Sequence, residues 1–138
     1  MIKEIDIGDK QSIYTLGKEL NPKYISLYDI DEILKDKSQI IYGYYEDNNI
    51  IGFIHLTISF DEADIINVIV QKQYRNQGIG SSLISHSIKE NKLQKLNLEV
   101  KESNNNAIKF YENLGFKKIR IIKNYYGTEN AFFMVKML

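Results

Sequence analysis

The sequence predicts an α/β protein in which helices cover both faces of a mixed sheet. Three observations support this: hairpin-like strand pairs fill the first half, strands and helices alternate in the middle, and two strands close the chain. Such a mixture is typical of a sheet packed between helices. With 138 residues, 43% of them hydrophobic, the chain is long and apolar enough to form a single domain over residues 1–138.

The first third of the chain predicts one strand and two helices. Residues 2–7 alternate as a half-buried strand does. Asp9 is expected to cap a helix that runs to about Leu20 and ends at Asn21-Pro22, because proline disfavours a helical conformation in the residue before it. A second, short helix is expected over residues 29–35. Its apolar face consists of Ile30, Ile33 and Leu34.

The next third predicts three strands joined by turns. Residues 39–45 and 50–59 are β-rich segments, and the Asp-Asn-Asn sequence at 47–49 is typical of a hairpin turn between them. A second turn is expected at residues 60–63. It leads to a strand over residues 64–70, which is apolar and rich in β-branched residues.

A run with two glycines, Tyr74-Arg75-Asn76-Gln77-Gly78-Ile79-Gly80-Ser81, precedes a helix expected over residues 80–90. Its inward residues are Leu83, Ile84 and Ile88. Glycines allow a tight turn and a close ligand, and the N–H groups of the turn and of the first helical turn converge on one point. This favours binding of a phosphorylated small molecule. The alternative is a glycine-rich cap. A P-loop is excluded because Gly-Lys-Ser/Thr is absent, and Leu83 excludes a dinucleotide fingerprint.

The last third predicts a strand at residues 96–100 and a helix at 104–114 that Gly115 ends. Two final strands are expected at 116–122 and 131–137. The helix has apolar residues at helical spacing, namely Ala107, Phe110, Tyr111 and Leu114.

The composition excludes several classes of function. The net charge is zero, so a nucleic-acid-binding face is not expected. No apolar run approaches 18 residues, and the residues from Met1 to Glu4 lack the apolar region typical of a signal peptide, so we expect a cytoplasmic protein that does not bind membranes. The absence of cysteine excludes disulfides, thiolate metal sites and a cysteine acyl-enzyme. His55 and His86 lack ligand spacing, so no metal is expected.

Two residues are candidates for proton transfer. Glu99 shares one strand face with Asn97 and Lys101, and it becomes a candidate base if that face lines a cleft. Otherwise it is a solvated charge. Tyr111 could donate a proton to a departing thiolate, although a tyrosine in an apolar stripe is more often a core residue.

Two polar clusters have similar alternatives. The asparagines that follow Ser103 could cap the next helix or hydrogen-bond a ligand's amides. Asp61, Glu62 and Asp64 could be solvated turn residues or an acidic lip that attracts a cationic amine.

Two segments of the chain resemble the two sequence motifs of a known family, and they occur in the same order as in that family. Residues 62–80 end in Arg75-Asn76-Gln77-Gly78-Ile79-Gly80 and resemble motif A of the GNAT acetyltransferase superfamily, R/Q-x-x-G-x-G/A. Residues 98–116 resemble its motif B. The tail, with Ile122-Lys123-Asn124-Tyr125-Tyr126 and residues 129–134, is similar to the ribosomal-protein alanine N-acetyltransferases, the RimI type. The resemblance covers roughly residues 50–138 and implies a mostly antiparallel GNAT sheet.

The resemblance also implies acetyl-CoA as co-substrate. Its pyrophosphate is expected on the loop, with Arg75 and the residues Asn76, Gln77, Gly78, Ile79, Gly80 and Ser81 as the contacts. Its pantetheine is expected along Val68, Ile69 and Val70, with Asn104 on the CoA arm. The matching positions make Glu99 the general base and Tyr111 the general acid. Without cysteine, the amine would attack the thioester directly.

The acceptor implied by the resemblance is a protein N-terminal α-amine, with a ribosomal protein N-terminus as one example. The first third departs from the RimI type, which has a tryptophan and proline segment there, whereas this chain has no tryptophan and reads Asn21-Pro22-Lys23-Tyr24. Two alternatives therefore stay open. One is an acetyltransferase for a small-molecule amine or a lysine, and the other is a non-catalytic acyl-CoA-binding module.

Overall fold

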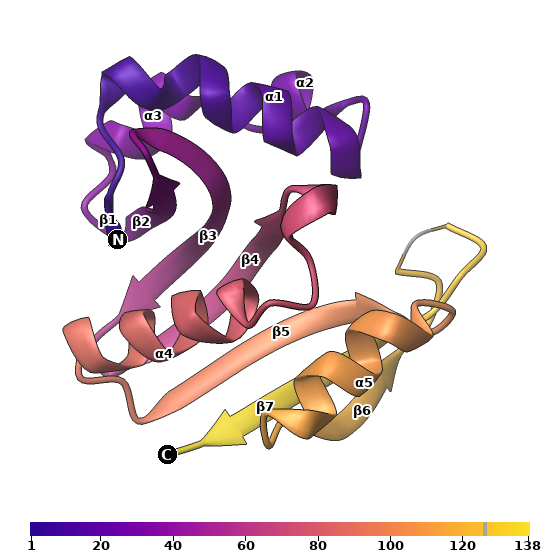
Figure 1. Cartoon of the computed structure of the whole chain (residues 1–138). Coiled ribbons are helices and arrows are strands. Elements are labelled where there is room, and N and C mark those ends of the chain that lie inside the picture. The colour runs from indigo at the N-terminus through magenta and orange to yellow at the C-terminus, as the bar shows by residue number, and fades with distance from the viewer. Residues whose placement is uncertain (126) are drawn as a thin grey trace.

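The computed structural model describes residues 1–125 and 127–138 and contains one seven-stranded sheet. The strand order is β1-β2-β3-β4-β5-β7-β6, and neighbouring strands are antiparallel except β4 and β5, which are parallel (Figure 1). The predicted mixed, mostly antiparallel sheet is therefore confirmed. The strands are β1 (Ile2–Glu4), β2 (Gln39–Glu46), β3 (Asn49–Ser59), β4 (Glu62–Val70), β5 (Lys95–Lys101), β6 (Lys117–Ile122) and β7 (Ala131–Met137).

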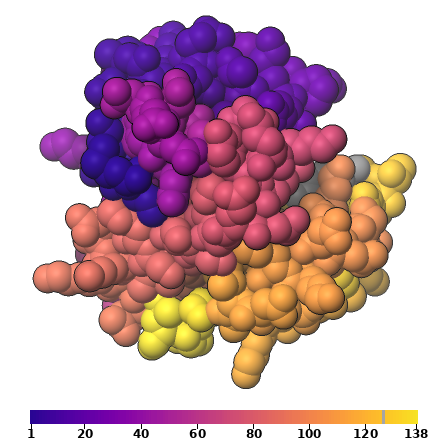
Figure 2. Space-filling model, in the orientation of Figure 1, coloured from indigo at the N-terminus to yellow at the C-terminus, as the bar shows by residue number. Residues whose placement is uncertain are grey.

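Helices cover both faces of the sheet, as the sequence predicts. One layer packs on β2–β4 and the other lies on the opposite face, each with its own core. The first layer consists of α1 (Lys10–Leu20), α2 (Tyr24–Leu27) and α3 (Ile30–Lys35), and the second of α4 (Ile79–Glu90) and α5 (Asn105–Asn113). Figure 2 shows the N-terminal layer in indigo and violet stacked on the middle of the chain, with α5 in orange alongside.

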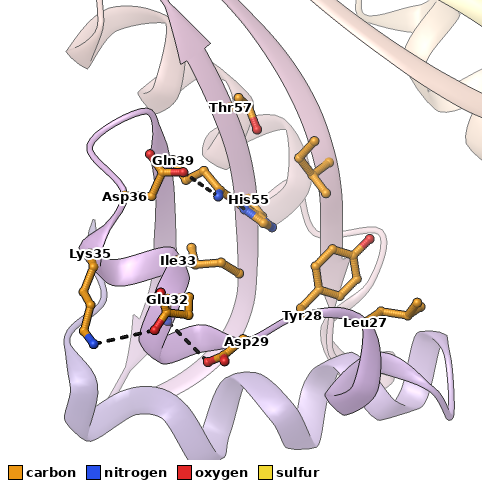
Figure 3. A pocket seen from close by; sticks show the side chains of 11 residues that line it. Leu27, Tyr28, Asp29, Glu32, Ile33, Lys35, Asp36, Gln39, His55 and Thr57 are labelled. Carbon is orange, nitrogen blue, oxygen red and sulfur yellow. Dashed lines mark hydrogen bonds and ion pairs between the residues drawn. The ribbon is translucent and has the colours of Figure 1, made fainter.

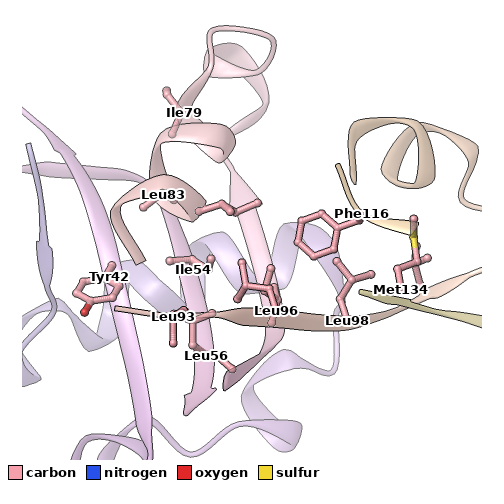
Figure 4. Close-up of a cluster of buried hydrophobic side chains, with 14 of the residues drawn as sticks. Tyr42, Ile54, Leu56, Ile79, Leu83, Leu93, Leu96, Leu98, Phe116 and Met134 are labelled. Atoms are coloured by element: carbon pink, nitrogen blue, oxygen red, sulfur yellow. The ribbon is translucent and has the colours of Figure 1, made fainter. Parts of the chain in front are cut away.

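The larger core lies between the sheet and the α4–α5 layer. Leu83 of α4 and Leu96 of β5 have no exposed surface, and neither does Met134 of β7 (Figure 4). These residues come from the middle and the end of the chain, so burial of their side chains holds the two halves of the sheet together. The smaller core fills the space under α1, α2 and α3.

The N-terminal strand is shorter than predicted. β1 ends at Glu4, and Ile7 already belongs to a 3₁₀ helix, η1 (Ile7–Asp9). The reason is local capping: the Asp6 carboxylate accepts from the Gly8 N–H at 2.8 Å. Helix α1 begins directly after Asp9, as expected. However, the Asp9 carboxylate does not cap α1, because it accepts from the Asp6 N–H at 3.0 Å and the Tyr45 hydroxyl at 2.8 Å.

Helix α2 was not predicted, since four residues give too little periodicity. It is fixed by Tyr24, which is fully buried against α1. A Cβ on Gly17 would lie 2.4 Å from the Tyr24 ring, so only glycine lets α1 and α2 approach this closely. Helix α3 matches the prediction, with Asp29 as its N-cap, but Leu34 is 37% exposed and is not part of the core face.

The β2–β3 turn is tighter than predicted. Asp47 and Asn48 both have positive φ, 51° and 67°, which is the conformation of a two-residue hairpin turn, and Asn49 belongs to β3. The next turn is also short. β4 begins at Glu62, and its first two residues pair with Ser59 and Ile58 of β3.

β4 and β5 run side by side only at their beginnings. The register joins Glu62–Asp64 to Lys95–Asn97, and among the described residues no further β4–β5 pair follows. At the same level β4 has a β-bulge: His55 of β3 pairs with Asn67 and Leu56 with Ile65, which leaves Ile66 as an extra residue. The bulge bends the strand. β4 and β5 therefore diverge and leave an opening in the sheet (Figure 1).

Candidate active site

The opening between β4 and β5 is bordered by the elements that the sequence singles out. The 3₁₀ helix η2 (Lys72–Tyr74) and the glycine loop follow β4, and α4 begins beside it. Helix α5 follows β5 and reaches α4 at Gly80, where a Cβ would lie 3.1 Å from the Phe110 ring. The structure therefore brings the glycine loop, β4, β5 and α5 together.

The loop before α4 turns through two left-handed residues, Asn76 with φ 63° and Gly78 with φ 80°. The first α-helical hydrogen bond runs from the Ser82 N–H to the Gly78 carbonyl at 3.0 Å. The N–H groups of Gly78, Ile79, Gly80 and Ser81 precede this bond and have no acceptor inside the helix. Among the described residues no side chain caps them. This end of α4 can therefore donate several hydrogen bonds to an anion.

The two glycines have different roles. No described atom lies within 4 Å of a Cβ built on Gly78, so the space beside it is open to a ligand. Gly80 instead faces Phe110 of α5 and Val68 of β4, at 3.1 Å and 3.7 Å from a Cβ. Its missing side chain thus serves packing between α4 and α5.

The side chains of the loop mostly contact the protein. Arg75 Nε donates to the Val70 carbonyl at 2.9 Å, which ties the loop to the end of β4. Gln77 Nε2 donates to the Gln73 carbonyl at 3.5 Å, and the Ile79 side chain lies in the core. Backbone groups therefore supply most of the loop's binding capacity.

The free edge of β4 offers backbone groups to the opening. Val68, Ile69 and Val70 pair with β3 on one side, at Ile54, Phe53 and Gly52 respectively. β5 does not pair with them on the other side. An unpaired strand edge can bind an extended ligand as an additional strand would. The carbonyl of Val70 is already occupied by Arg75.

Glu99 lies on β5 beyond the point where β4 and β5 separate. Its neighbours Leu98 and Val100 are buried in the α4–α5 core, so the exposed Glu99 side chain projects from the opposite face, on the side of the N-terminal layer. Asn97 projects from the same face and donates to Glu62 Oε1 at 2.9 Å and Asp64 Oδ1 at 3.0 Å.

The predicted acidic lip is largely occupied by protein partners. Hydrogen bonds from Asn97 and Lys95 lower the pKa of Glu62, and Lys95 Nζ lies 3.2 Å from its carboxylate. Asp64 accepts from Asn97 as well, and Asp61 lies in an exposed turn. The carboxylates of Glu62 and Asp64 therefore help to fix the register between β4 and β5.

Tyr111 lies on α5, on the other side of the sheet from Glu99. Its ring is half-buried and meets Phe110 and Phe116 edge-to-face, with centroids 5.1 Å and 5.4 Å away. Burial raises the pKa of Tyr111 to about 12, so the hydroxyl keeps its proton at neutral pH. The two predicted catalytic residues therefore lie on opposite faces of the sheet.

Asn104 caps α5 with its side-chain oxygen, which accepts from the Ala107 N–H at 3.2 Å. Its exposed amide nitrogen can still donate to a ligand. Both predicted roles are thus compatible in one residue.

A cleft of about 520 Å³ lies on the face of the sheet that carries Glu99 (Figure 3). Sequence reasoning missed its central residue, His55, which is 1% exposed. The only sequence signal was a histidine in the middle of an apolar strand. The cleft is lined by Leu27, Tyr28, Asp29, Glu32, Ile33, Lys35, Asp36, Gln39, His55, Thr57 and Ile66.

Two further observations concern the described part of the chain. None of its helices is long and apolar enough to span a membrane. It also contains no group of three or more His, Cys, Asp or Glu side chains that could hold a metal ion. Tyr126, which belongs to the tail that resembles the RimI type, is outside the described residues.

Comparison with known proteins gives relatives of nearly the same length. The chain is 27% identical over 154 aligned positions to an N-alpha-acetyltransferase of Saccharolobus solfataricus, covering 99% of this chain and 92% of that protein. The structure of the ribosomal-protein-S18-alanine N-acetyltransferase of Escherichia coli superposes with a TM-score of 0.83 at 26% identity, covering 99% of this chain and 92% of that one.

A GNAT family acetyltransferase of Elizabethkingia anophelis, whose structure has acetyl-CoA bound, superposes with a TM-score of 0.81 at 25% identity. The coverage is 100% of this chain and 97% of the other. The model of the acetyltransferase (GNAT) family matches residues 8–116. These residues include the opening, the glycine loop and α5. The chain therefore belongs to the GNAT acetyltransferase family.

Proposed function

We propose that this enzyme moves an acetyl group from acetyl-CoA directly to a protein N-terminal α-amine. The observation that carries the proposal is the opening between β4 and β5, which has free N–H groups of α4 at one end and Glu99 on one face, while Tyr111 lies on α5 on the opposite face of the sheet. An elongated donor can enter from the α4–α5 side, and the acceptor can enter from the side of the N-terminal layer.

The donor site rests on backbone groups. The N–H groups of residues 76–81 would bind the pyrophosphate, supported by the dipole of α4 and by the open space at Gly78. The free edge at Val68–Val70 would bind the pantetheine amides, and the Asn104 amide would contact the same arm. The related Elizabethkingia structure, with acetyl-CoA bound, supports this choice of donor.

Glu99 and Tyr111 would move the two protons of the reaction. As the amine nitrogen bonds to the thioester carbon and the carbon–sulfur bond breaks, Glu99 accepts the proton that the nitrogen loses, directly or through a water. The Tyr111 hydroxyl donates a proton to the departing sulfur. Solvent then removes the proton from Glu99 and reprotonates Tyr111.

The choice of an α-amine rests on proton chemistry and on relatives. An α-amine has a pKa near 8 and a lysine amine one near 10.4, so deprotonating lysine at neutral pH costs about 3 kcal/mol more. A single exposed carboxylate such as Glu99 suits the easier proton. The names of the Saccharolobus and Escherichia relatives, N-alpha and ribosomal-protein alanine acetyltransferases, support the same class of acceptor.

The test is mass spectrometry of acceptors incubated with the protein and acetyl-CoA. The panel contains peptides with a free N-terminus, the same peptides blocked at the N-terminus but containing lysine, and small amines. Acetylation of the free N-termini alone is the expected result. Acetylation confined to lysine or to small amines would show that these, and not α-amines, are the acceptors. Binding of acetyl-CoA without transfer to any acceptor would indicate a non-catalytic binding module.

A further inference from the structure

The cleft around His55 offers hydrogen-bond acceptors and apolar walls. Ile33 of α3 and Ile66 of β4 contribute apolar side chains to its lining, and Figure 3 shows His55 of β3 close to Ile33. Three carboxylates, those of Asp29, Glu32 and Asp36, line the cleft, and Lys35 is the one cationic side chain among its lining, since His55 is neutral at pH 7. The excess of negative charge favours a cationic occupant.

The ring of His55 is held in a single tautomer. Gln39 Nε2 donates to Asp36 Oδ2 at 3.0 Å, so Gln39 Oε1 must face His55 Nε2, which lies 2.7 Å away. Burial lowers the pKa of His55 to about 4, so the ring is neutral at pH 7, and its proton sits on Nε2. Nδ1 therefore carries a lone pair.

That lone pair has no hydrogen-bond partner among the described residues. Nδ1 is one of the few buried polar atoms in this state. Buried polar atoms are normally hydrogen-bonded, and leaving one unpaired is unfavourable. The rings of Tyr28 and His55 lie nearly perpendicular with centroids 5.8 Å apart, and both side chains line the cleft. Nδ1 of His55 is therefore an acceptor with no donor paired to it.

We propose that this cleft binds the ammonium or guanidinium side chain of a lysine or arginine close to the N-terminus of the acceptor peptide. Ammonium and guanidinium groups only donate hydrogen bonds, which matches Nδ1 of His55 and the carboxylates of Glu32 and Asp29. The methylene groups of such a side chain match Ile33 and Ile66. The inference rests on the proposed function and names the substrate more narrowly.

The position of the cleft suits a residue next to the reacting amine. Ile66, which lines the cleft, is the bulge residue at which β4 and β5 begin to separate. Val68, which lies at the end of the expected pantetheine site away from the glycine loop, is two residues further, roughly 7 Å along the strand. In an extended peptide the second or third residue lies about this far from the N-terminal amine, so its side chain can reach the cleft.

The experiment compares acetylation of peptides that differ at one residue. Lysine, norleucine and glutamine are placed at the second or third position of an alanine-initiated peptide, and kcat and KM are measured for each. Lysine peptides are expected to have a kcat/KM about tenfold higher than norleucine peptides, with the difference in KM, because the cleft lies away from the reacting atoms. Equal values for lysine and norleucine would overturn the inference.

Variants of the cleft separate the charge effect from a structural one. Glu32→Gln should reduce the preference for lysine, Lys35→Gln should increase it, and Glu32→Lys should shift it toward glutamate-bearing peptides. Glu32 and Lys35 form an exposed pair at 3.6 Å, so these changes should leave the fold intact. Glu46→Gln makes the same charge change at an exposed position on β2 outside the cleft, and an equal loss of preference in that control would contradict the assignment.

A binding measurement separates this inference from the proposed reaction. The ¹⁵N signal of His55 Nδ1 is followed as N-terminally acetylated lysine or norleucine peptide is added without acetyl-CoA. A shift toward the hydrogen-bonded position with lysine alone supports the cleft, even if no peptide is acetylated in the kinetic assay. No shift with either peptide would overturn the inference, whereas the acetyl transfer itself is judged from the panel of acceptors alone.

Discussion

Gln39 fixes the tautomer of His55: its side-chain oxygen lies 2.7 Å from His55 Nε2, while its amide nitrogen donates to Asp36. The two residues face each other from neighbouring strands, β2 and β3. A buried histidine with a fixed tautomer and a lowered pKa links the stability of the fold to pH.

Stability should fall as the solution becomes acidic between about pH 6.5 and pH 4. The folded pKa of His55 is lowered from 6.5 to about 4, so the unfolded chain binds a proton first and is favoured as the pH falls through this window. The contribution is on the order of 3 kcal/mol, present in full above pH 6.5. Urea unfolding across this range measures it. His55→Gln should flatten the dependence, and the control His86→Gln should keep it. An unchanged free energy of unfolding of the parent protein between pH 6.5 and pH 4 would contradict the lowered pKa of His55.

Gly78→Asp should abolish binding of acetyl-CoA. Gly78 has φ 80° and open space at its Cβ position, so the new carboxylate would project where the pyrophosphate is expected. In the parent, ligand at 100 times Kd should add about 2.7 kcal/mol to the free energy of unfolding. Gly78→Asn is the matched control, since asparagine tolerates the same conformation without the charge and should retain part of the gain. Thermal unfolding with and without ligand measures both, and an unresponsive parent would contradict the donor site.

Tyr111→Phe should lower kcat about 100-fold with little change in acetyl-CoA affinity, because the variant lacks the proton donor. The edge-to-face contacts of the ring with Phe110 and Phe116 do not involve the hydroxyl, so the fold should persist. Single-turnover kinetics and ligand titration give the two quantities. A folded variant that turns over at the parental rate would exclude Tyr111 as the general acid.

Glu99→Gln should flatten the acid limb of the kcat/KM profile and reduce the rate at neutral pH. The amide keeps the size of the carboxylate but cannot accept the proton of the amine. Because Glu99 is exposed, the free energy of unfolding should change little. Glu90→Gln removes the same charge at the exposed end of α4 and should leave the profile unchanged. Superimposed profiles for parent and Glu99→Gln would show that the amine loses its proton by another route.

The elements with strong local signals could be predicted from sequence. Residues 80–90 and 104–114 have apolar positions at helical spacing and glycines at their ends, and α4 and α5 match them within one or two residues. Helix α2 could not be predicted, because contact between Tyr24 and Gly17 of another helix creates it. The start of β4 was placed two residues late, since its first residues look like a turn until β3 and β5 pair with them.

The candidate site shows the same division. The glycine loop was located from its residues, but packing of Phe110 against Gly80 depends on contact between two residues that are 30 positions apart in the sequence. The divergence of β4 and β5 follows from the bulge at Ile66, and nothing in an apolar run marks a bulge. His55 was missed because its neighbours along the strand are apolar, whereas its polar partner Gln39 comes from the adjacent strand.

The close packing of Gly80 and Phe110 connects the predicted donor site on α4 with the helix that carries Tyr111. The first turn of α4 and the ring of Phe110 are in van der Waals contact, and Tyr111 is the next residue on α5. Close-packed groups cannot shift independently. Occupancy of the α4 terminus and the placement of α5, which carries Tyr111, would therefore be coupled, and such a coupling acts equally in both directions. A donor seated on the loop would restrict the position of the acid that later protonates its sulfur.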